Sequence, residues 1–289
     1  MQIIKISPRG FCSGVVNAWK IVKDTIKQNP ECRVFMLGWF VHNQKMLDEV
    51  RSDNLFILDD TNLTRYELVK NLKVKPNDIL ILSAHGTDEK TIKLAKSKGL
   101  KIIDTTCEYV YKTHDVIKNG LINNKQVVYL GKENHPESLA ALSISDKVIL
   151  VTDPQQLMDI NFNLPTIITN QTTLSIYDLK SCYQFIEQHF TNYEIKNDLC
   201  LATQQRQEAL INLKTKLDVL IVVGDNKSNN SQQLLKIGKY KKIPLCFLVN
   251  SLQEVQSLNL NPKYVVGITS GASTPTSLTN TIIKYLQEL

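Results

Sequence analysis

The sequence has no run of about eighteen uninterrupted apolar residues, so no segment is predicted to cross a bilayer. We expect no signal peptide, because a motif containing Cys12 begins as early as Pro8. The lysines are scattered rather than gathered into a basic tract with interleaved aromatic residues, a pattern that gives little support for nucleic-acid binding. These absences predict a cytoplasmic protein that binds neither membrane nor nucleic acid.

Two nucleotide-binding signatures are also missing, the phosphate loop G-x-x-x-x-G-K-[ST] and the dinucleotide fingerprint G-x-G-x-x-G. The chain has six cysteines but no C-x₂-C pair. In a reducing compartment we interpret the cysteines as ligands, reactive groups or buried small side chains rather than as a disulfide framework. With 289 residues, 43% of them hydrophobic, the chain is long enough for two or three domains with buried cores.

Three of the cysteines share one local setting. Cys12, Cys107 and Cys200 each follow a predicted strand and precede a predicted helix. The intervals between them are 95 and 93 residues, about the size of a small α/β module. If such modules pack around an axis, the three thiols converge at one point, which predicts a metal centre.

Histidines and a carboxylate follow other predicted strands. His85 follows the buried apolar strand 78–83, and His42 precedes a helix predicted from about Gln44 to Val50. His135 and Glu137 flank Pro136, which is typical of the first turn of a helix. Ligands of open α/β sheets bind at the carboxyl ends of strands, and an imidazole close to a carboxylate is a plausible proton-transfer pair.

Three further strand ends carry hydroxyls and amides, which would make the central cavity suited to a small anion. Thr173 in the first of these turns is equally well explained as a helix cap. The residues are Thr172 and Thr173 after strand 166–169, Ser228, Asn229 and Asn230 after strand 218–223, and Ser273 after strand 264–269. Cys32, Cys182 and Cys246 lack such a setting, and we expect them to serve in packing.

The chemistry of the three thiolates leaves alternatives open. Zinc is one, although structural zinc sites usually have a fourth protein ligand and closely spaced cysteine pairs. A 4Fe-4S cluster held by three cysteines is another, and its fourth iron would be open to a substrate oxygen. Composition and spacing alone therefore indicate a cluster-dependent redox enzyme or lyase that acts on a small anion.

Seven motifs, in register over nearly the whole chain, resemble the 4-hydroxy-3-methylbut-2-enyl diphosphate reductase family. They are Pro8-Arg9-Gly10-Phe11-Cys12-Ser13-Gly14-Val15, Ser83-Ala84-His85-Gly86, Asp104-Thr105-Thr106-Cys107, Asn134-His135-Pro136-Glu137, Gln171-Thr172-Thr173-Leu174-Ser175, Ala202-Thr203-Gln204-Gln205-Arg206-Gln207 and Gly271-Ala272-Ser273-Thr274-Pro275. The resemblance implies an enzyme that reduces an allylic diphosphate to isopentenyl and dimethylallyl diphosphates, the last step of the non-mevalonate isoprenoid pathway. It also implies a ferredoxin or flavodoxin as the electron donor.

The resemblance also implies a role for each matching residue. Cys12, Cys107 and Cys200 match the ligands of a 4Fe-4S cluster. Glu137 matches the proton donor, with Thr172 and His135 beside it. The positions that hold the diphosphate match His42, His85, His135, Ser228, Asn230 and Ser273, with Asn229 standing where a second serine is common.

The fold implied by the family is a pseudo-threefold cloverleaf of three α/β modules around the cluster. We predict modules at 14–107, 108–199 and 200–289, the last completed by the N-terminal strand 1–13. Two rival functions are a non-catalytic iron-sulfur sensor or carrier and a zinc hydrolase. Glu108, where relatives usually have proline, and Asn229 are departures whose effect on activity the sequence does not show.

Overall fold

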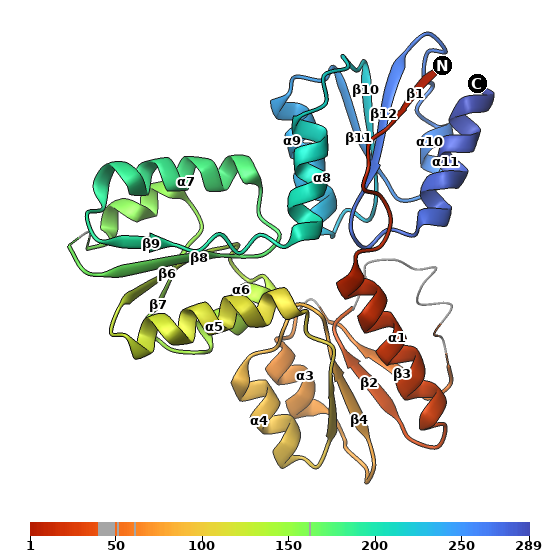
Figure 1. Cartoon of the computed structure of the whole chain (residues 1–289). Helices are drawn as coiled ribbons and strands as arrows, with labels where there is room; N and C mark the ends of the chain where they lie inside the picture. Colours follow the sequence, from red (N-terminus) through yellow and green to blue (C-terminus); the bar gives the residue numbers. More distant parts are fainter. Residues whose placement is uncertain (40–49, 51, 61, 162) are drawn as a thin grey trace.

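The computed structural model describes residues 1–39, 50, 52–60, 62–161 and 163–289. Within these residues the strands form three separate four-stranded sheets, and neighbouring strands are parallel throughout. The strand orders are β3-β2-β4-β5, β7-β6-β8-β9 and β1-β12-β10-β11. The three units spread like the leaves of a clover around a common centre (Figure 1). The predicted α/β cloverleaf is therefore the observed architecture.

The strands are short and their central members are almost completely buried, which explains why they appear in the sequence as continuous apolar runs. They are β1 (Gln2–Lys5), β2 (Val34–Leu37), β3 (Leu55–Leu58), β4 (Ile79–Leu82), β5 (Lys101–Asp104), β6 (Gln126–Leu130), β7 (Val148–Val151), β8 (Thr166–Asn170), β9 (Tyr193–Ile195), β10 (Val219–Val223), β11 (Leu245–Val249) and β12 (Val265–Ser270).

Helices cover both faces of each sheet (Figure 1). They are α1 (Ser13–Gln28), α3 (Arg65–Asn71), α4 (Glu89–Ser97), α5 (Glu108–Ile122), α6 (Pro136–Leu142), α7 (Ile176–His189), α8 (Leu201–Ile211), α9 (Asn229–Tyr240), α10 (Leu252–Gln256), α11 (Thr276–Glu288) and a 3₁₀ helix (Pro154–Asp159). None of the helices described is both long and apolar enough to span a membrane.

The first strand of the chain belongs to the last sheet. β1 pairs with β12, and Gln2 lies opposite Val265. Beyond the strand, the Gly10 amide donates to the Ser270 hydroxyl over 2.8 Å, and the Cys12 amide donates to the Ala272 carbonyl over 3.0 Å. The Cys12 turn is therefore fixed to the β12–α11 turn, although 260 residues separate them in the sequence.

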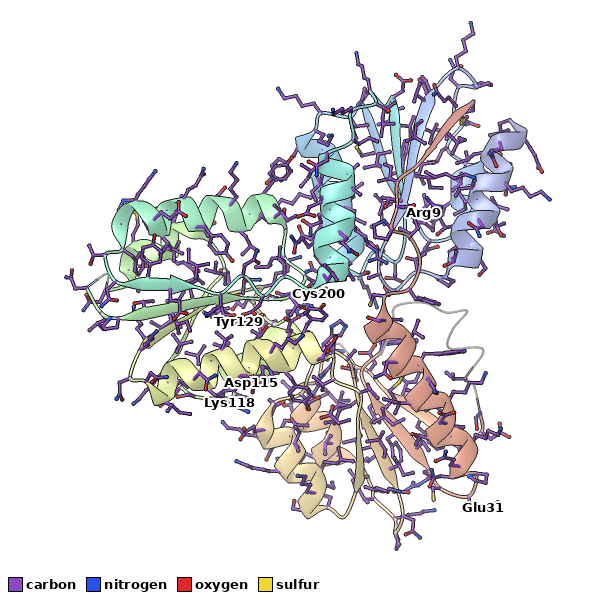
Figure 2. All side chains as sticks on the ribbon, viewed as in Figure 1. Arg9, Glu31, Asp115, Lys118, Tyr129 and Cys200 are labelled. Atoms are coloured by element: carbon purple, nitrogen blue, oxygen red, sulfur yellow. The ribbon has the colours of Figure 1, made fainter. Side chains whose placement is uncertain are left out.

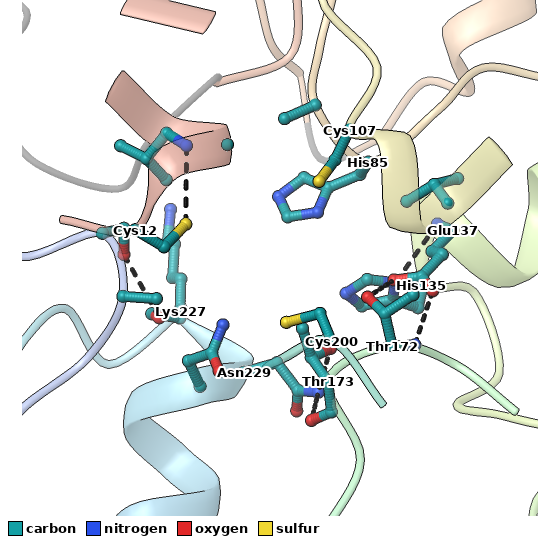
Figure 3. Close-up of a pocket in the computed structure, with 18 residues that line it drawn as sticks. Cys12, His85, Cys107, His135, Glu137, Thr172, Thr173, Cys200, Lys227 and Asn229 are labelled. Atoms are coloured by element: carbon teal, nitrogen blue, oxygen red, sulfur yellow. Dashed lines mark hydrogen bonds between the residues drawn. The ribbon is translucent and has the colours of Figure 1, made fainter. Parts of the chain in front are cut away.

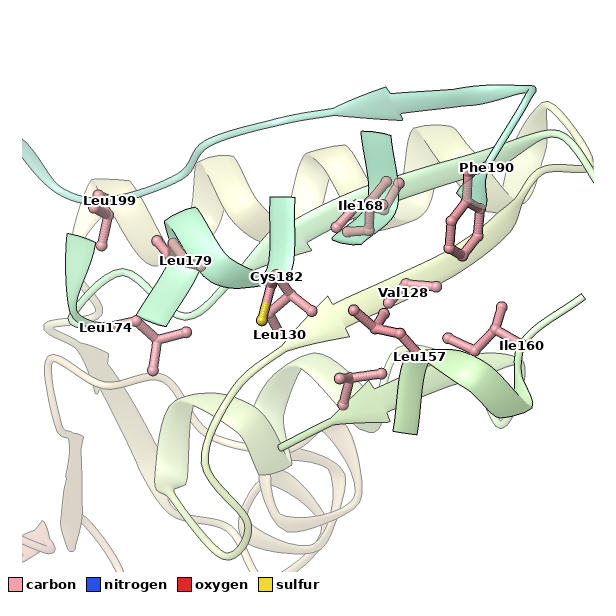
Figure 4. Packing of buried hydrophobic residues seen from close by; sticks show 12 residues of the cluster. Val128, Leu130, Leu157, Ile160, Ile168, Leu174, Leu179, Cys182, Phe190 and Leu199 are labelled. Atoms are coloured by element: carbon pink, nitrogen blue, oxygen red, sulfur yellow. The ribbon is translucent and has the colours of Figure 1, made fainter. Parts of the chain in front are cut away.

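Each sheet packs its apolar side chains against the helices on both faces. In the β6–β9 sheet, one such cluster joins Ile168 of β8 to Leu179 and Cys182 of α7 (Figure 4). Burial raises the pKa of the Cys182 thiol to about 11, as expected for a thiol that packs and does not react. Cys32 and Cys246 are partly buried against two other clusters, in agreement with the packing role predicted for all three.

The connection to Cys200 differs from the predicted one. Cys200 does not end a strand directly, since β9 stops at Ile195 and a loop of four residues leads to the cysteine. In that loop the Lys196 amide donates to the Ile168 carbonyl over 2.7 Å, and the Asp198 amide donates to the Asn170 side chain over 3.0 Å, so the loop stays attached to β8. The helix predicted from Gln44 to Val50 lies, except for Val50, outside the described residues.

Candidate metal centre and anion pocket

One pocket lies where the three modules meet, and all three sheets contribute to it at the carboxyl ends of their strands (Figures 2 and 3). Figure 2 shows Cys200 at this meeting point, while charged side chains such as Glu31 and Lys118 lie on the outer surface. The pocket is lined by Cys12, Gly14, Val15, Ala84, His85, Cys107, Val110, His135, Glu137, Thr172, Thr173, Cys200, Lys227, Ser228, Asn229, Asn230, Ala272 and Ser273.

The three cysteines each occupy the N-cap position of a helix. The Cys12 sulfur accepts from the Val15 amide over 3.4 Å at the start of α1. The Cys200 sulfur accepts from the Thr203 amide over 3.4 Å at the start of α8 and lies 3.0 Å from the Thr203 hydroxyl. Cys107 caps α5 without a side-chain hydrogen bond to the helix. The positive end of each helix dipole thus favours a negative sulfur.

The surroundings of the cysteines fit a cationic metal group. Burial raises the pKa of the Cys107 thiol to about 11, and the nearby sulfurs of Cys200 and Cys12 contribute to the rise. Three thiolates together therefore need positive charge to be stable. A side chain at Gly14 would place its Cβ 3.0 Å from the Cys107 sulfur, so the glycine keeps space open beside that sulfur.

The three sulfurs face the same pocket from different elements. Among the described residues, no three His, Cys, Asp or Glu side chains are arranged to hold one metal ion. The three sulfurs instead line different walls of the pocket (Figure 3).

A carboxyl group faces the same pocket from the second module. Glu137, in the first turn of α6, is 1% exposed, and its carboxylate accepts from the Thr172 amide over 2.6 Å and from the Thr172 hydroxyl over 3.1 Å. Burial raises the pKa of Glu137 to about 7, against the lowering effect of the two Thr172 hydrogen bonds, and Asp198 adds to the rise. A carboxyl group with this pKa is half protonated near neutral pH, which suits a general acid.

Two histidines lie beside the carboxyl group. His135 caps α6, and its Nδ1 accepts from the Glu137 amide over 3.2 Å, so its Nε2 side is directed away from the helix. The rings of His85 and His135 lie edge to face with centroids 5.5 Å apart. The structure therefore brings His85, His135, Glu137 and Thr172 together, whereas His42 lies outside the described residues.

The opposite wall of the pocket is the N-terminus of α9. Ser228 caps this helix, and the Ser273 hydroxyl lies 3.4 Å from the Ser228 hydroxyl. The Asn230 amide oxygen accepts from the Thr203 hydroxyl over 2.8 Å and so connects this wall to the Cys200 turn. Free amides of a helix N-terminus and neighbouring hydroxyls are a typical arrangement for binding phosphate.

Asn229 bridges the second and third modules. Its Nδ2 donates to the carbonyl and the hydroxyl of Thr173, each over 2.8 Å. Its Oδ1 accepts from the Lys132 ammonium group and from Gln233. Both the nitrogen and the oxygen of its side-chain amide thus have hydrogen-bond partners within the protein. Ser228, Asn230 and Ser273 are therefore the more available groups for a ligand.

The turn that carries His85 is held from behind by an arginine that sequence reasoning missed. Arg65 of α3 donates to the Ser83 hydroxyl over 2.7 Å, to the Thr87 hydroxyl over 3.2 Å and to the Gly86 carbonyl. Burial lowers the pKa of this guanidinium to about 10, so it remains charged at neutral pH. No motif in the sequence connects Arg65 with this turn.

A second residue that the motifs did not single out is Lys227. It lines the pocket directly before Ser228, and it is the one lysine or arginine among the lining residues that the structure describes. Its position next to Ser228, a predicted phosphate-binding residue, is the feature of the sequence that could have indicated it. The pocket therefore combines three thiols, a protonatable carboxyl group and a wall of hydroxyls and amides at a helix N-terminus.

The fold and the pocket define a class: a three-module α/β protein whose central pocket is lined by three cysteines, a buried carboxyl group and a helix N-terminus. The LytB protein family model matches residues 3–287, and the chain belongs to this family. The prediction made from the seven motifs is thereby confirmed, because curated relatives of the chain bear the name 4-hydroxy-3-methylbut-2-enyl diphosphate reductase.

Two relatives and two solved structures illustrate the similarity. The protein of Malacoplasma penetrans is 41% identical, covering 100% of this chain and 98% of the relative, and that of Shouchella clausii is 37% identical, covering 99% and 91%. The solved reductase from Plasmodium falciparum is 28% identical with a TM-score of 0.86, over 99% of this chain and 88% of that one. A structure described as the terminal enzyme of the non-mevalonate pathway is 26% identical with a TM-score of 0.68, over 100% and 99%. The three-module fold is thus that of solved reductases.

Proposed function

We propose that the chain reduces 4-hydroxy-3-methylbut-2-enyl diphosphate to isopentenyl and dimethylallyl diphosphates. The carbon–oxygen bond of the alcohol breaks, two electrons and two protons enter, and the oxygen leaves as water. The observation that carries the proposal is that three thiols, a buried carboxyl group and a helix N-terminus face one pocket. The thiols can hold an electron carrier, the carboxyl group can supply a proton, and the helix N-terminus can bind a diphosphate.

We assign Cys12, Cys107 and Cys200 as the ligands of a 4Fe-4S cluster. A cluster bound by only three cysteines supplies electrons and offers one iron as a Lewis acid. The helix N-caps favour the thiolate form of the ligands. The side chains of Val15, Ala84, Val110 and Ala272 line the same pocket and limit the access of water.

The diphosphate end of the substrate is assigned to the wall formed by Ser228, Asn230 and Ser273. The N-terminus of α9 contributes amide donors there, and Lys227 adds a positive charge. His85 and His135 approach from the other modules, and we include His42 from the family resemblance. A substrate bound at this wall would direct its alcohol toward the thiols and Glu137 (Figure 3).

Glu137 is assigned as the proton donor. Thr172 holds both carboxylate oxygens, so the carboxyl group has a fixed position. His135 is tied to the same helix turn by the Glu137 amide, which donates to its Nδ1, and it lines the pocket beside the carboxyl group. Protonation of the departing oxygen lets it leave as water, which is a better leaving group than hydroxide.

We also propose an external electron donor, a ferredoxin or a flavodoxin, as the family resemblance implies. An acidic carrier would suit the net charge of +6. A cytoplasmic location accords with six free cysteines, since thiols persist in a reducing compartment.

Anaerobic purification followed by iron and sulfide analysis tests the proposal. We expect about four irons and four sulfides per chain, a brown protein, and turnover of the allylic diphosphate with a strong artificial reductant. A colourless zinc protein would support the hydrolase alternative. A brown protein without turnover would support the sensor or carrier alternative.

Replacing His85 by alanine should weaken substrate binding by about 1.5–3 kcal/mol, the usual loss for a hydrogen bond to a charged group. Iron content should not change, because His85 holds no metal in this assignment. Calorimetry with the diphosphate substrate on the loaded protein measures the effect. His189→Ala in α7, which does not line the pocket, is the control, and unaltered affinity of the His85→Ala variant would return His85 to a structural role.

Replacing Arg65 by lysine should weaken substrate binding through His85. Lysine keeps the charge but loses the fork that reaches Ser83, Gly86 and Thr87 together, so we expect an affinity about 2- to 10-fold lower. Combining Arg65→Lys with His85→Ala should add little to His85→Ala alone. Additive losses in this double-mutant cycle would mean that Arg65 does not act by positioning His85.

A further inference from the structure

Arg206 is a buried arginine that lies between two of the cysteine turns. It belongs to α8, which begins after Cys200, and is 4% exposed. One terminal nitrogen donates to the Ala202 carbonyl over 2.8 Å, and the other donates to the Gly10 carbonyl over 2.7 Å. The side chain therefore connects the helix turn after Cys200 with the turn before Cys12.

The Gly10 turn is itself closely constrained. Gly10 has a φ of +87°, and a Cβ there would lie 2.2 Å from the Thr276 hydroxyl oxygen. Its amide is held by Ser270, as described above. The bond from Arg206 to its carbonyl therefore contacts a segment that cannot easily shift, so the guanidinium fixes the distance between the Cys12 and Cys200 turns.

Arg206 has no acidic partner in the part of the chain that the structure describes. Every ion pair found there involves other residues, and the Arg206 Nε is buried without a hydrogen-bond acceptor. Buried charges in proteins are normally paired, because an isolated ion is costly to remove from water. The counter-charge must come from another kind of group.

The candidates for that counter-charge are the cysteine sulfurs of the two turns that Arg206 joins. Burial lowers the pKa of the Arg206 guanidinium, and the thiolates of Cys12 and Cys200 are the groups that raise it. Arginine stays protonated in proteins, so the positive charge remains beside the sulfurs. It lies behind the ligands, and Arg206 is not among the residues that line the pocket.

We infer that Arg206 is a positioning residue that joins the Cys12 and Cys200 turns, and that its fixed charge favours the reduced state of the metal centre. The inference rests on the proposed function, since it takes the three cysteines as ligands of a 4Fe-4S cluster. An added electron makes the centre more negative, so a nearby cation stabilises the reduced state more than the oxidised state. Net charge and hydrogen bonding around the sulfurs are among the factors that set the potential of such clusters.

A matched pair of substitutions separates the charge from the shape. Arg206→Gln keeps a polar side chain but removes the charge, whereas Arg206→Lys keeps the charge and loses the planar fork. Arg65→Gln is the control for removing another buried guanidinium, because its partners are Ser83, Gly86 and Thr87. Each protein is purified anaerobically, its iron is measured, and its midpoint potential is determined by a redox titration followed by electron paramagnetic resonance.

We expect the Arg206→Gln protein to show a more negative midpoint potential than the parent, or to lose its iron during purification. Arg206→Lys should keep its iron and stay close to the parent potential, and Arg65→Gln should leave the potential unchanged. A parent-like potential and iron content in Arg206→Gln would overturn the inference. Equal shifts in the Gln and Lys variants would also overturn the charge effect. A parent protein without iron would instead refute the proposed function.

Discussion

Replacing Cys12, Cys107 or Cys200 by serine is expected to remove most of the iron and sulfide from the protein. A serine hydroxyl loses its proton far less readily than a thiol, and iron–sulfur clusters are usually held by thiolates. In the proposed assignment each cysteine is one of three ligands, and among the described residues no other cysteine lines the pocket to replace it. The expected loss is nearly complete for each single substitution.

Iron and sulfide are measured on proteins that are expressed and purified without oxygen. The control is the same substitution at Cys32, Cys182 or Cys246, which pack in hydrophobic clusters and are not among the residues that line the pocket. These variants should retain nearly all of their iron. The ligand assignment is wrong if Cys32→Ser loses the cluster as completely as Cys107→Ser does.

The positions of the cysteines could be predicted from the sequence because they depend on local structure. An apolar run followed by a short polar turn and an amphipathic pattern predicts a strand, a turn and a helix, and parallel strands end at the same edge. Cys107 follows this rule directly, since only two residues separate it from β5. Cys12 and Cys200 follow it with longer connections, of six residues after β1 and four residues after β9.

The contacts between modules could not be predicted from the sequence in the same way. Arg206 bonds to a carbonyl 196 residues away, and Asn229 bonds to Thr173 from another module. Such pairs have no spacing rule, since they depend on how the three sheets dock. Asn229 is an example: the family resemblance places it among the substrate-binding residues, which stays a prediction, and the sequence did not indicate that its side chain also joins two modules.

The module boundaries at 107/108 and 199/200 stay a prediction, although each sheet is complete within its own part of the chain apart from β1. β1 pairs with β12, so Cys12, which follows β1, approaches the centre from the third sheet. The cloverleaf arrangement was predicted from the family resemblance. The spacing of the cysteines by itself predicted only three modules of similar size.

Replacing Glu137 by glutamine should lower the turnover number by about 10²–10⁴, the usual contribution of a general acid. Glutamine has the same shape, and its amide oxygen can still accept from the Thr172 amide. It cannot readily release a proton. We therefore expect the variant to keep its iron and to bind the allylic diphosphate nearly as well as the parent, because an acid that acts only in the reaction contributes little to binding.

The raised pKa of Glu137 gives this prediction a pH dependence. With a pKa of about 7, the carboxyl group holds its proton below neutral pH and loses it above. The parent's turnover number should accordingly be constant at low pH and fall about tenfold per unit at higher pH. The residual activity of Glu137→Gln should lack this decline, because the amide does not titrate.

Steady-state assays with a strong artificial reductant, under anaerobic conditions and with iron measured on the same samples, test both parts. Glu137→Asp is a useful companion, since it keeps an acid but withdraws it from the site by one methylene. It should recover part of the activity and the decline with pH. A glutamine variant that runs near the parent rate with full iron would contradict the assignment, and the proton would then have to come from His135 or from the substrate's own diphosphate.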